Sequence, residues 1–92
     1  MIVSFRTKAL ARLYSDDNPR SIRPDLVRRV TQILSYLDTA STPQGLRLPG
    51  LDLHSLKGHL EGHWAVSVNA NWRITFTFRD GNAHDVALVD YH

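Results

Sequence analysis

The alternation of apolar and polar residues is clearest between residues 64 and 79. Two stretches on either side of a short turn place an apolar side chain at every second position: Trp64, Val66, Val68, then Trp72, Ile74, Phe76, Phe78. Because strand side chains point alternately to opposite faces, these stretches predict a hairpin with one apolar face. The intervening positions supply a second, polar face that would be free to touch a ligand: Ser67, Arg73, Thr75, Thr77.

Apolar positions in the first half of the chain follow helical spacing instead. Six leucine, isoleucine and valine residues recur every three or four positions between residues 26 and 37, which is typical of an amphipathic helix. Pro24 suits the first turn of this helix, which we expect to run to about Thr39. A shorter helix is expected over residues 8–15, with Thr7 as its capping residue.

The remaining segments complete an α+β pattern. Residues 2–5 predict a strand that joins or flanks the sheet, residues 40–53 an ordered loop rich in proline and glycine, and residues 83–91 a last strand. The predicted fold is one domain over residues 1–92. Two N-terminal helices pack against a small antiparallel sheet, which consists of a C-terminal three-strand meander and the N-terminal strand.

Length and composition exclude several classes of protein. A chain of 92 residues forms one domain, too small for a second lobe. The absence of cysteine excludes disulfides, thiolate zinc sites and cysteine nucleophiles. Since no apolar run approaches the ~20 residues that cross a bilayer, and the N-terminus does not resemble a signal peptide, we expect a soluble cytoplasmic protein.

Positive charge is concentrated in the first third of the chain. Residues 1–30 contain seven basic and three acidic residues, whereas residues 31–92 contain four basic and six acidic residues. Nine of the eleven cations are arginine, which suits contact with phosphate, so Arg28 and Arg29 on the longer helix are candidates for binding a polyanion. The alternative is that these arginines only solvate a helix face.

Histidines near the hairpin and at the chain end are candidates for acid/base chemistry. Metal-free RNA cleavage requires a base for the 2′-hydroxyl proton, an acid for the departing 5′ oxygen, and cations near the phosphorus. Histidine as a residue type can act as base or acid near neutral pH, which makes His54 and His92 candidates, while Lys57 and Arg73 can supply positive charge. The alternative for His54 is a histidine that only bonds to the backbone of its loop.

A zinc site formed by His54, His59 and His63 is a further alternative. His59 and His63 are four residues apart, a spacing that brings two ligands together only on a helix. Gly58, Gly62 and the strand that begins after His63 disfavour a helix there, so no metal is expected.

Three stretches together resemble a known family. LPGLDLHSLKG, the hairpin WAVSVNANWRITF and the terminal VDYH resemble the HigB toxins of bacterial toxin–antitoxin pairs, within the RelE-like superfamily. The resemblance implies a ribosome-dependent mRNA interferase that cuts messenger RNA in the A site of the 70S ribosome by metal-independent chemistry, without a cofactor. It also implies neutralisation by HigA, an antitoxin whose helix-turn-helix domain would bring the pair to operator DNA.

The resemblance also implies functional positions. The family's functional histidine matches His54, and its C-terminal acid, tyrosine and histidine match three consecutive residues: Asp90, Tyr91, His92. Basic positions beside the site match Lys57 and Arg73. The loop in relatives usually reads L-H-P-L-K-G, whereas Ser55 stands here in place of the proline and removes a restraint on φ next to His54.

The alternation of side chains between the two faces of a strand limits which residues of the last strand can meet. In a regular strand Asp90 and His92 would face one way and Tyr91 the other, so all three meet one phosphate only if the terminus leaves the sheet, as we expect. Two other functions stay open from the residues alone: a non-catalytic module that binds RNA or protein, and a ribonuclease that needs no ribosome.

Overall fold

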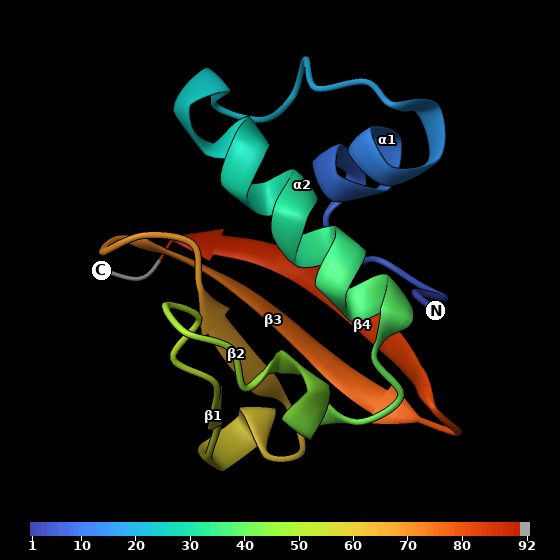
Figure 1. Cartoon of the computed structure of the whole chain (residues 1–92), viewed down its shortest axis with the longest axis vertical. Helices are drawn as coiled ribbons and strands as arrows, with labels where there is room; N and C mark the ends of the chain where they lie inside the picture. The colour runs from blue at the N-terminus through green and yellow to red at the C-terminus, as the bar shows by residue number, and fades with distance from the viewer. Residues whose placement is uncertain (91–92) are drawn as a thin grey trace.

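A computed structural model, which describes residues 1–90, shows two helices followed by a four-stranded antiparallel sheet (Figure 1). The helices are α1 (Lys8–Asp16) and α2 (Pro24–Thr39). The strands are neighbours in sequence order: β1 (His54–Ser55), β2 (Trp64–Ser67), β3 (Trp72–Arg79), β4 (Asn82–Asp90). Two short 3₁₀ turns, η1 (Pro43–Leu46) and η2 (Gly58–Leu60), lie on either side of β1. The predicted α+β class is confirmed.

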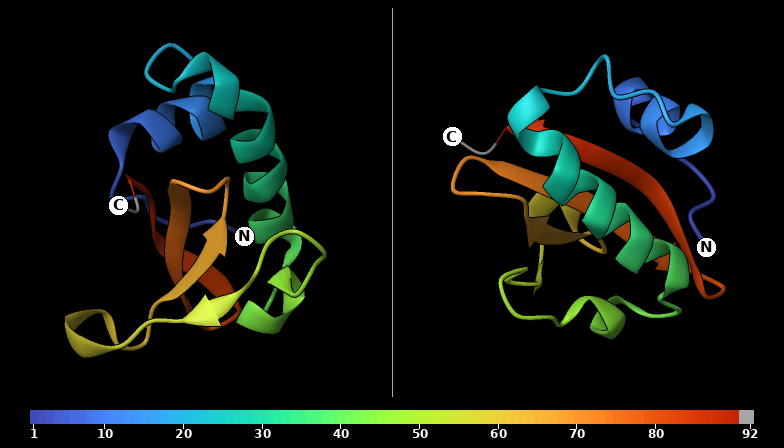
Figure 2. Two further views of the ribbon diagram at one scale, coloured as in Figure 1. Left: turned by 90° about the vertical axis from the view of Figure 1, so that its left-hand side faces the viewer. Right: turned by 45° about the horizontal axis from the view of Figure 1, so that its top comes forward.

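Helix α2 covers the apolar face of the sheet, and both helices lie on that side (Figure 2). Its predicted stripe is buried: Leu26, Val30, Ile33, Leu34, Leu37. These side chains join the sheet residues Val66, Ile74 and Phe76, each 0% exposed, in one core cluster. The helix begins at Pro24 and ends at Thr39, as predicted. Neither helix in residues 1–90 has the length and apolar composition needed to span a membrane.

Helix α1 ends one residue later than predicted, and Thr7 precedes it as predicted. Thr7 occupies the N-cap position, but its side chain makes no capping hydrogen bond. Its Oγ1 instead accepts a hydrogen bond of 3.0 Å from the backbone N–H of Leu88. The hydroxyl therefore joins the start of α1 to β4, a contact between residues far apart in the sequence.

Strand β1 (His54–Ser55) completes the four-stranded sheet, in the place predicted for the N-terminal segment. Residues 2–5 run parallel to β4 and form only two isolated bridges, from Ile2 to Ala83 and from Phe5 to Val86. Between these bridges Asp85 adopts a φ of 55°. Its N–H bonds the side chain of Ser4 at 2.9 Å. This irregularity interrupts the ladder, so the N-terminal segment flanks β4 without becoming a regular strand.

The register defines a second face of the sheet, opposite the helices, that we call the polar face. Direct pairing places one cross-strand row on it: His54, Ala65, Thr75, Ala87. The next row towards the β2–β3 turn holds Ser67, Arg73, Val89. This arrangement confirms the predicted separation of apolar and polar sides. Thr75 is nevertheless only 6% exposed, so it is not itself available to a ligand, contrary to the prediction for this residue.

The carboxylate of Asp38 joins three segments on the helical side. Its Oδ1 accepts hydrogen bonds from the Tyr14 hydroxyl at 2.5 Å and from the Ile2 backbone N–H at 3.1 Å. The bond from Tyr14, followed by that from Ile2, lowers the pKa of Asp38 below its ordinary value of 3.8. The same bond raises the pKa of the Tyr14 hydroxyl.

Asp38→Asn is expected to lower the free energy of unfolding at pH 7 by about 0.5–1 kcal/mol, because a charged acceptor of two hydrogen bonds is lost in a partly solvated site. Since the pKa of Asp38 is lower in the folded chain, this contribution is present above the unfolded pKa and disappears as the pH falls through the folded pKa. Urea unfolding of parent and variant at pH 7 and pH 3 measures the difference.

The control is Asp16→Asn, at an exposed carboxylate of α1. It should leave stability nearly unchanged at both pH values. An equal loss for Asp38→Asn at pH 7 and pH 3 would show that the ionised carboxylate is not the stabilising group.

Candidate functional site

His54 lies in β1, where it pairs with Ala65, and not in a loop as predicted. Its Nδ1 is 2.9 Å from the backbone oxygen of Asp52. Because a carbonyl oxygen can only accept, Nδ1 carries the hydrogen of the neutral ring and the lone pair is on Nε2. Ser55, which stands where related loops have proline, is held by its pairing with Trp64. His54 is thus oriented as a proton acceptor through Nε2.

The loop before His54 is fixed from two sides. The Leu51 side chain is 0% exposed, and its backbone oxygen accepts a 2.7 Å hydrogen bond from the N–H of Ser67 in β2. On the other side Arg29 donates from Nη2 to the oxygen of Gly50 at 3.2 Å. These contacts hold the segment in which Asp52 takes a φ of 50° and presents its carbonyl to His54.

Asp52 was not among the sequence candidates. The signal for it is weak, since aspartate is one of the few residues other than glycine that tolerates positive φ. An aspartate two positions before a functional histidine is compatible with a turn in which the aspartate carbonyl points at the histidine ring. Only the folded loop shows that the Asp52 carbonyl points at the His54 ring.

The two arginines predicted to bind a polyanion differ in their surroundings. Arg28 is exposed on α2. Arg29 is half-buried and donates to Gln32 at 2.9 Å as well as to Gly50. Arg29 therefore has a structural role in positioning the His54 loop, and Arg28 is the better candidate for a contact with RNA.

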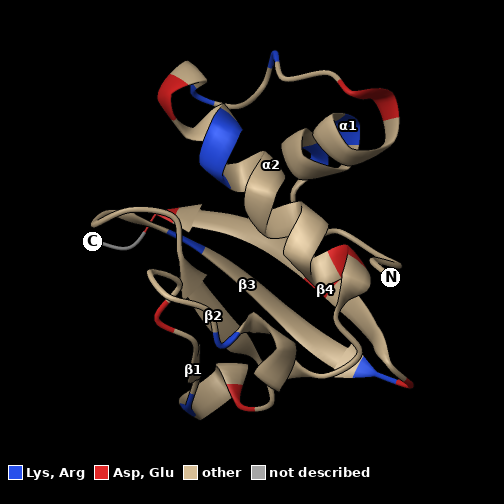
Figure 3. Ribbon diagram, viewed as in Figure 1, with Lys and Arg blue, Asp and Glu red and all other residues tan. Residues whose placement is uncertain are grey.

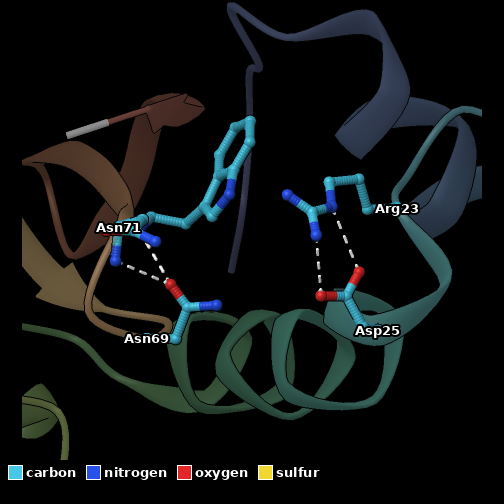
Figure 4. A network of polar contacts seen from close by, with 5 residues as sticks. Arg23, Asp25, Asn69 and Asn71 are labelled. Atoms are coloured by element: carbon cyan, nitrogen blue, oxygen red, sulfur yellow. Dashed lines mark hydrogen bonds and ion pairs between the residues drawn. The ribbon is translucent and has the colours of Figure 1, made fainter. Parts of the chain in front are cut away.

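Positive charge near the start of α2 is partly neutralised (Figure 3). Arg23 and Asp25 form an exposed ion pair of 3.1 Å, with a second hydrogen bond of 3.2 Å. Figure 4 shows this pair opposite the β2–β3 turn, where Asn69 Oδ1 accepts a 2.8 Å bond from the N–H of Asn71. The start of α2 and this turn lie at the same end of the molecule.

Arg73 lies on the polar face, and its guanidinium is anchored to the β2–β3 turn. Its Nη1 donates to the backbone oxygen of Asn69 at 2.7 Å and to Ser67 Oγ at 3.3 Å. Arg73 is two strands from His54, about 10 Å across the sheet, and one row away, about 7 Å along it. His54 and Arg73 therefore lie on either side of β2, on the same face of the sheet.

The remaining predicted residues are placed less centrally. Asp90 ends β4 and pairs with Trp72, so it belongs to the face opposite His54, at the end of the sheet where Arg73 lies. Lys57 is exposed, two residues after the end of β1. Tyr91 and His92 lie outside the described residues, as does the expectation that the terminus leaves the sheet.

A zinc site does not form in the described part of the chain. Within residues 1–90 no three histidine, cysteine, aspartate or glutamate side chains cluster in a way that could hold a metal ion. His59 lies in the short turn η2 and His63 lies after it, so the two are not on a common α-helix. As Gly58 and Gly62 predict, residues 59–63 do not form an α-helix.

Gly50→Ala is expected to disturb His54 through Arg29. Gly50 has a φ of 84°, and an added Cβ would lie 3.2 Å from Arg29 Nη2. We expect a loss of about 1 kcal/mol in the free energy of unfolding from the strained backbone, with a displaced Arg29 in addition. Urea unfolding and the NMR chemical shifts of the His54 ring measure the two effects.

The matched control is Gly62→Ala. Gly62 has a φ of 91°, but an added Cβ would have no atom within 4 Å. Both variants should lose similar stability, and only Gly50→Ala should shift the His54 ring resonances. Identical His54 spectra in the two variants would show that Arg29 and Gly50 do not position the histidine.

Solved structures share this fold. The YoeB–YefM complex from Staphylococcus aureus matches with a TM-score of 0.63 at 20% identity, over 100% of this chain and 98% of that chain. A YoeB/ParE toxin from Agrobacterium tumefaciens matches with a TM-score of 0.55 at 13% identity, over 100% of this chain and 99% of that chain. The two helices and the sheet therefore have the same fold as these two proteins.

Sequence comparison identifies the family. Residues 3–92 match the model of the HigB-like toxin, described as the RelE-like toxin of the type II toxin–antitoxin system HigB. The chain is 39% identical over 92 residues to Endoribonuclease HigB of Proteus vulgaris, covering 100% of both. It is 35% identical over 97 residues to Toxin HigB-1 of Vibrio cholerae, covering 99% of this chain and 94% of that protein. The chain belongs to the HigB-like family, and the resemblance inferred from its motifs is confirmed.

Proposed function

We propose that this chain is an endoribonuclease that cuts mRNA in the ribosomal A site and thereby inhibits translation and growth. The observation that carries the proposal is the fixed tautomer of His54, whose Nδ1–H is bonded to the Asp52 carbonyl at 2.9 Å. This bond leaves Nε2 as a proton acceptor on the face that also carries Arg73. The name of the Proteus vulgaris relative, Endoribonuclease HigB, supports the same activity.

The chemistry follows from these groups and needs no metal ion. His54 Nε2 takes the proton of a 2′-hydroxyl, and the 2′ oxygen attacks the adjacent phosphorus. The bond from phosphorus to the 5′ oxygen breaks, and His92 donates a proton to that oxygen. The products are a 2′,3′-cyclic phosphate and a 5′-hydroxyl end. Arg73 and Lys57 stabilise the negative charge that grows on the phosphoryl oxygens, and Tyr91 completes the site. Asp90, which lies on the opposite face of the sheet, has no direct role in this step.

An antitoxin would control this activity. A structural neighbour, YoeB, was solved as a heterotetrameric complex with YefM, described as a toxin–antitoxin complex. We propose that this chain pairs in the cytoplasm with an antitoxin of the HigA type, whose helix-turn-helix domain would bring the complex to operator DNA.

Mapping of mRNA 5′ ends after induction in cells tests the proposed function. The matched reporters are one message with a start codon and the same message with that codon mutated. An A-site nuclease should produce ends in phase with codons, in the translated message only. A nuclease that needs no ribosome would cut both reporters, and a non-catalytic binding module would leave both intact.

A further inference from the structure

The polar face continues past the His54 row towards the β3–β4 turn. Thr77 pairs directly with His84, and Arg79 pairs with Asn82. The guanidinium of Arg79 reaches back along the strand, so that its Nη2 lies 3.1 Å from His84 Nδ1. None of these residues has a role in the proposed cleavage step.

The Arg79–His84 contact fixes the hydrogen on the imidazole of His84. A guanidinium has only donors and keeps its proton in proteins, so Nδ1 must accept the hydrogen bond. The ring hydrogen is therefore on Nε2. Beyond their mutual bond, the two side chains present only N–H donors and one full positive charge. Such a donor set binds anions, and phosphate in particular.

Nearby carboxylates do not neutralise Arg79 by direct pairing. Asp80 follows it in the turn, and Asp85 lies at the irregular position of β4. Across residues 1–90 the ion pair found within 4 Å is that of Arg23 with Asp25. Because Arg79 is also exposed, its charge is available to an external partner.

A third histidine belongs to the same part of the polar face. The backbone bond of 2.9 Å from the N–H of Leu56 to the oxygen of His63 continues the pairing of β1 with β2 by one residue. By strand alternation His63 then shares the side of Ala65, in the row of Thr77 and His84. Its Nδ1 is buried and has no hydrogen-bond partner within residues 1–90.

We propose that Arg79 and His84, with Thr77 and His63 beside them, form a second phosphate subsite that holds the phosphate next to the one that is cut. This inference rests on the proposed ribonuclease function. The row of Thr77 and His84 lies two residues along the strands from the His54 row, about 7 Å away. An RNA strand that crosses the polar face from Arg73 towards Arg79 meets both positions in succession.

The salt dependence of RNA binding tests the subsite. The probe is a short single-stranded 2′-O-methyl RNA, which cannot be cut because it lacks the attacking hydroxyl. Its affinity for the purified protein is measured by fluorescence anisotropy at several salt concentrations. Arg79→Gln should weaken binding about 3- to 10-fold and should reduce the slope of log K against log salt by about 0.7, the value for one phosphate contact to a single strand.

The control is Arg47→Gln, at an exposed arginine that follows η1. It should change neither affinity nor slope. A slope for Arg79→Gln equal to that of the parent would overturn the proposal, as would a parent that does not bind the probe. Circular dichroism of each variant shows that a changed slope does not come from unfolding.

A neutral methylphosphonate, moved one linkage at a time along the probe, locates the contact. For the parent one linkage should show a penalty that disappears in Arg79→Gln and persists in Arg73→Gln. Equal penalties in parent and Arg79→Gln at every linkage would overturn the subsite. These measurements follow binding, so a parent that binds through Arg79 but cuts no mRNA would refute the proposed function and leave the subsite standing.

Discussion

His54→Asn is expected to reduce mRNA cleavage by at least about 100-fold and to leave the fold intact, because general-base catalysis typically contributes 10²- to 10⁴-fold. Asparagine keeps a side-chain N–H close to the position from which His54 Nδ1 bonds the Asp52 carbonyl. It has no group equivalent to Nε2. The substitution therefore separates the orientation of the side chain from its ability to take a proton.

The matched control for this substitution is His59→Asn. His59 is exposed in the turn η2 and is not placed on the polar face by any strand pairing. Cleavage on programmed ribosomes and thermal unfolding should be measured for both variants. Cleavage at the parental rate by folded His54→Asn would show that the bond to Asp52 is only a structural contact, which is the alternative weighed for this histidine.

Arg73→Gln is expected to lower kcat by about 10²- to 10³-fold, as the loss of one preorganised charge at a reacting phosphate does. The side chain also anchors the β2–β3 turn through its 2.7 Å bond to Asn69, so we expect a loss of about 1 kcal/mol in the free energy of unfolding. Arg73→Lys should recover part of the charge effect and little of the anchoring, because an ammonium lacks the planar fork of donors.

The effects of substitution on kcat and on KM distinguish the role of Arg73 from that of Arg79. A group that acts on the charge developed in the transition state changes kcat, whereas one that holds a phosphate throughout the reaction changes KM. Single-turnover cleavage at several concentrations of Arg73→Gln and Arg79→Gln measures both constants. A change confined to KM in Arg73→Gln would assign this residue to substrate binding.

Sequence periodicity predicted the parts of the fold that have regular, amphipathic patterns. The stripe of α2 and the alternation from Trp72 to Phe78 specify one helix and one strand face without help from the rest of the chain. Family motifs added His54 and Arg73, which the register places on a common face.

The features that sequence could not predict depend on contacts between distant residues. Strand β1 has two residues, too few for any period, and exists because β2 pairs with it. The Thr7 hydroxyl bonds Leu88, 81 positions away, and not the helix that it precedes. Asp85 adds one residue to β4, so Val86 and Leu88 return to the helix side although strict alternation from Ala83 would put them on the polar face.

The tautomer of His54 was equally inaccessible from the sequence. It depends on the carbonyl of Asp52, whose position follows from Leu51 bonded to Ser67 and from Gly50 bonded to Arg29. Each of these residues is ordinary in the sequence. Their combined effect appears only when α2 and β2 hold the same loop.

Cleavage of a defined message on 70S ribosomes by the purified protein tests whether this chain cuts mRNA in the A site through the 2′-hydroxyl. The message carries a known A-site codon, and the product ends are identified chemically. We expect one cut within that codon, with a 2′,3′-cyclic phosphate on one product and a 5′-hydroxyl on the other. We expect no cut when the 2′-hydroxyl at that position is replaced by hydrogen. A 5′-phosphate product, or cleavage of the 2′-deoxy message, would contradict proton transfer from the 2′-hydroxyl to His54.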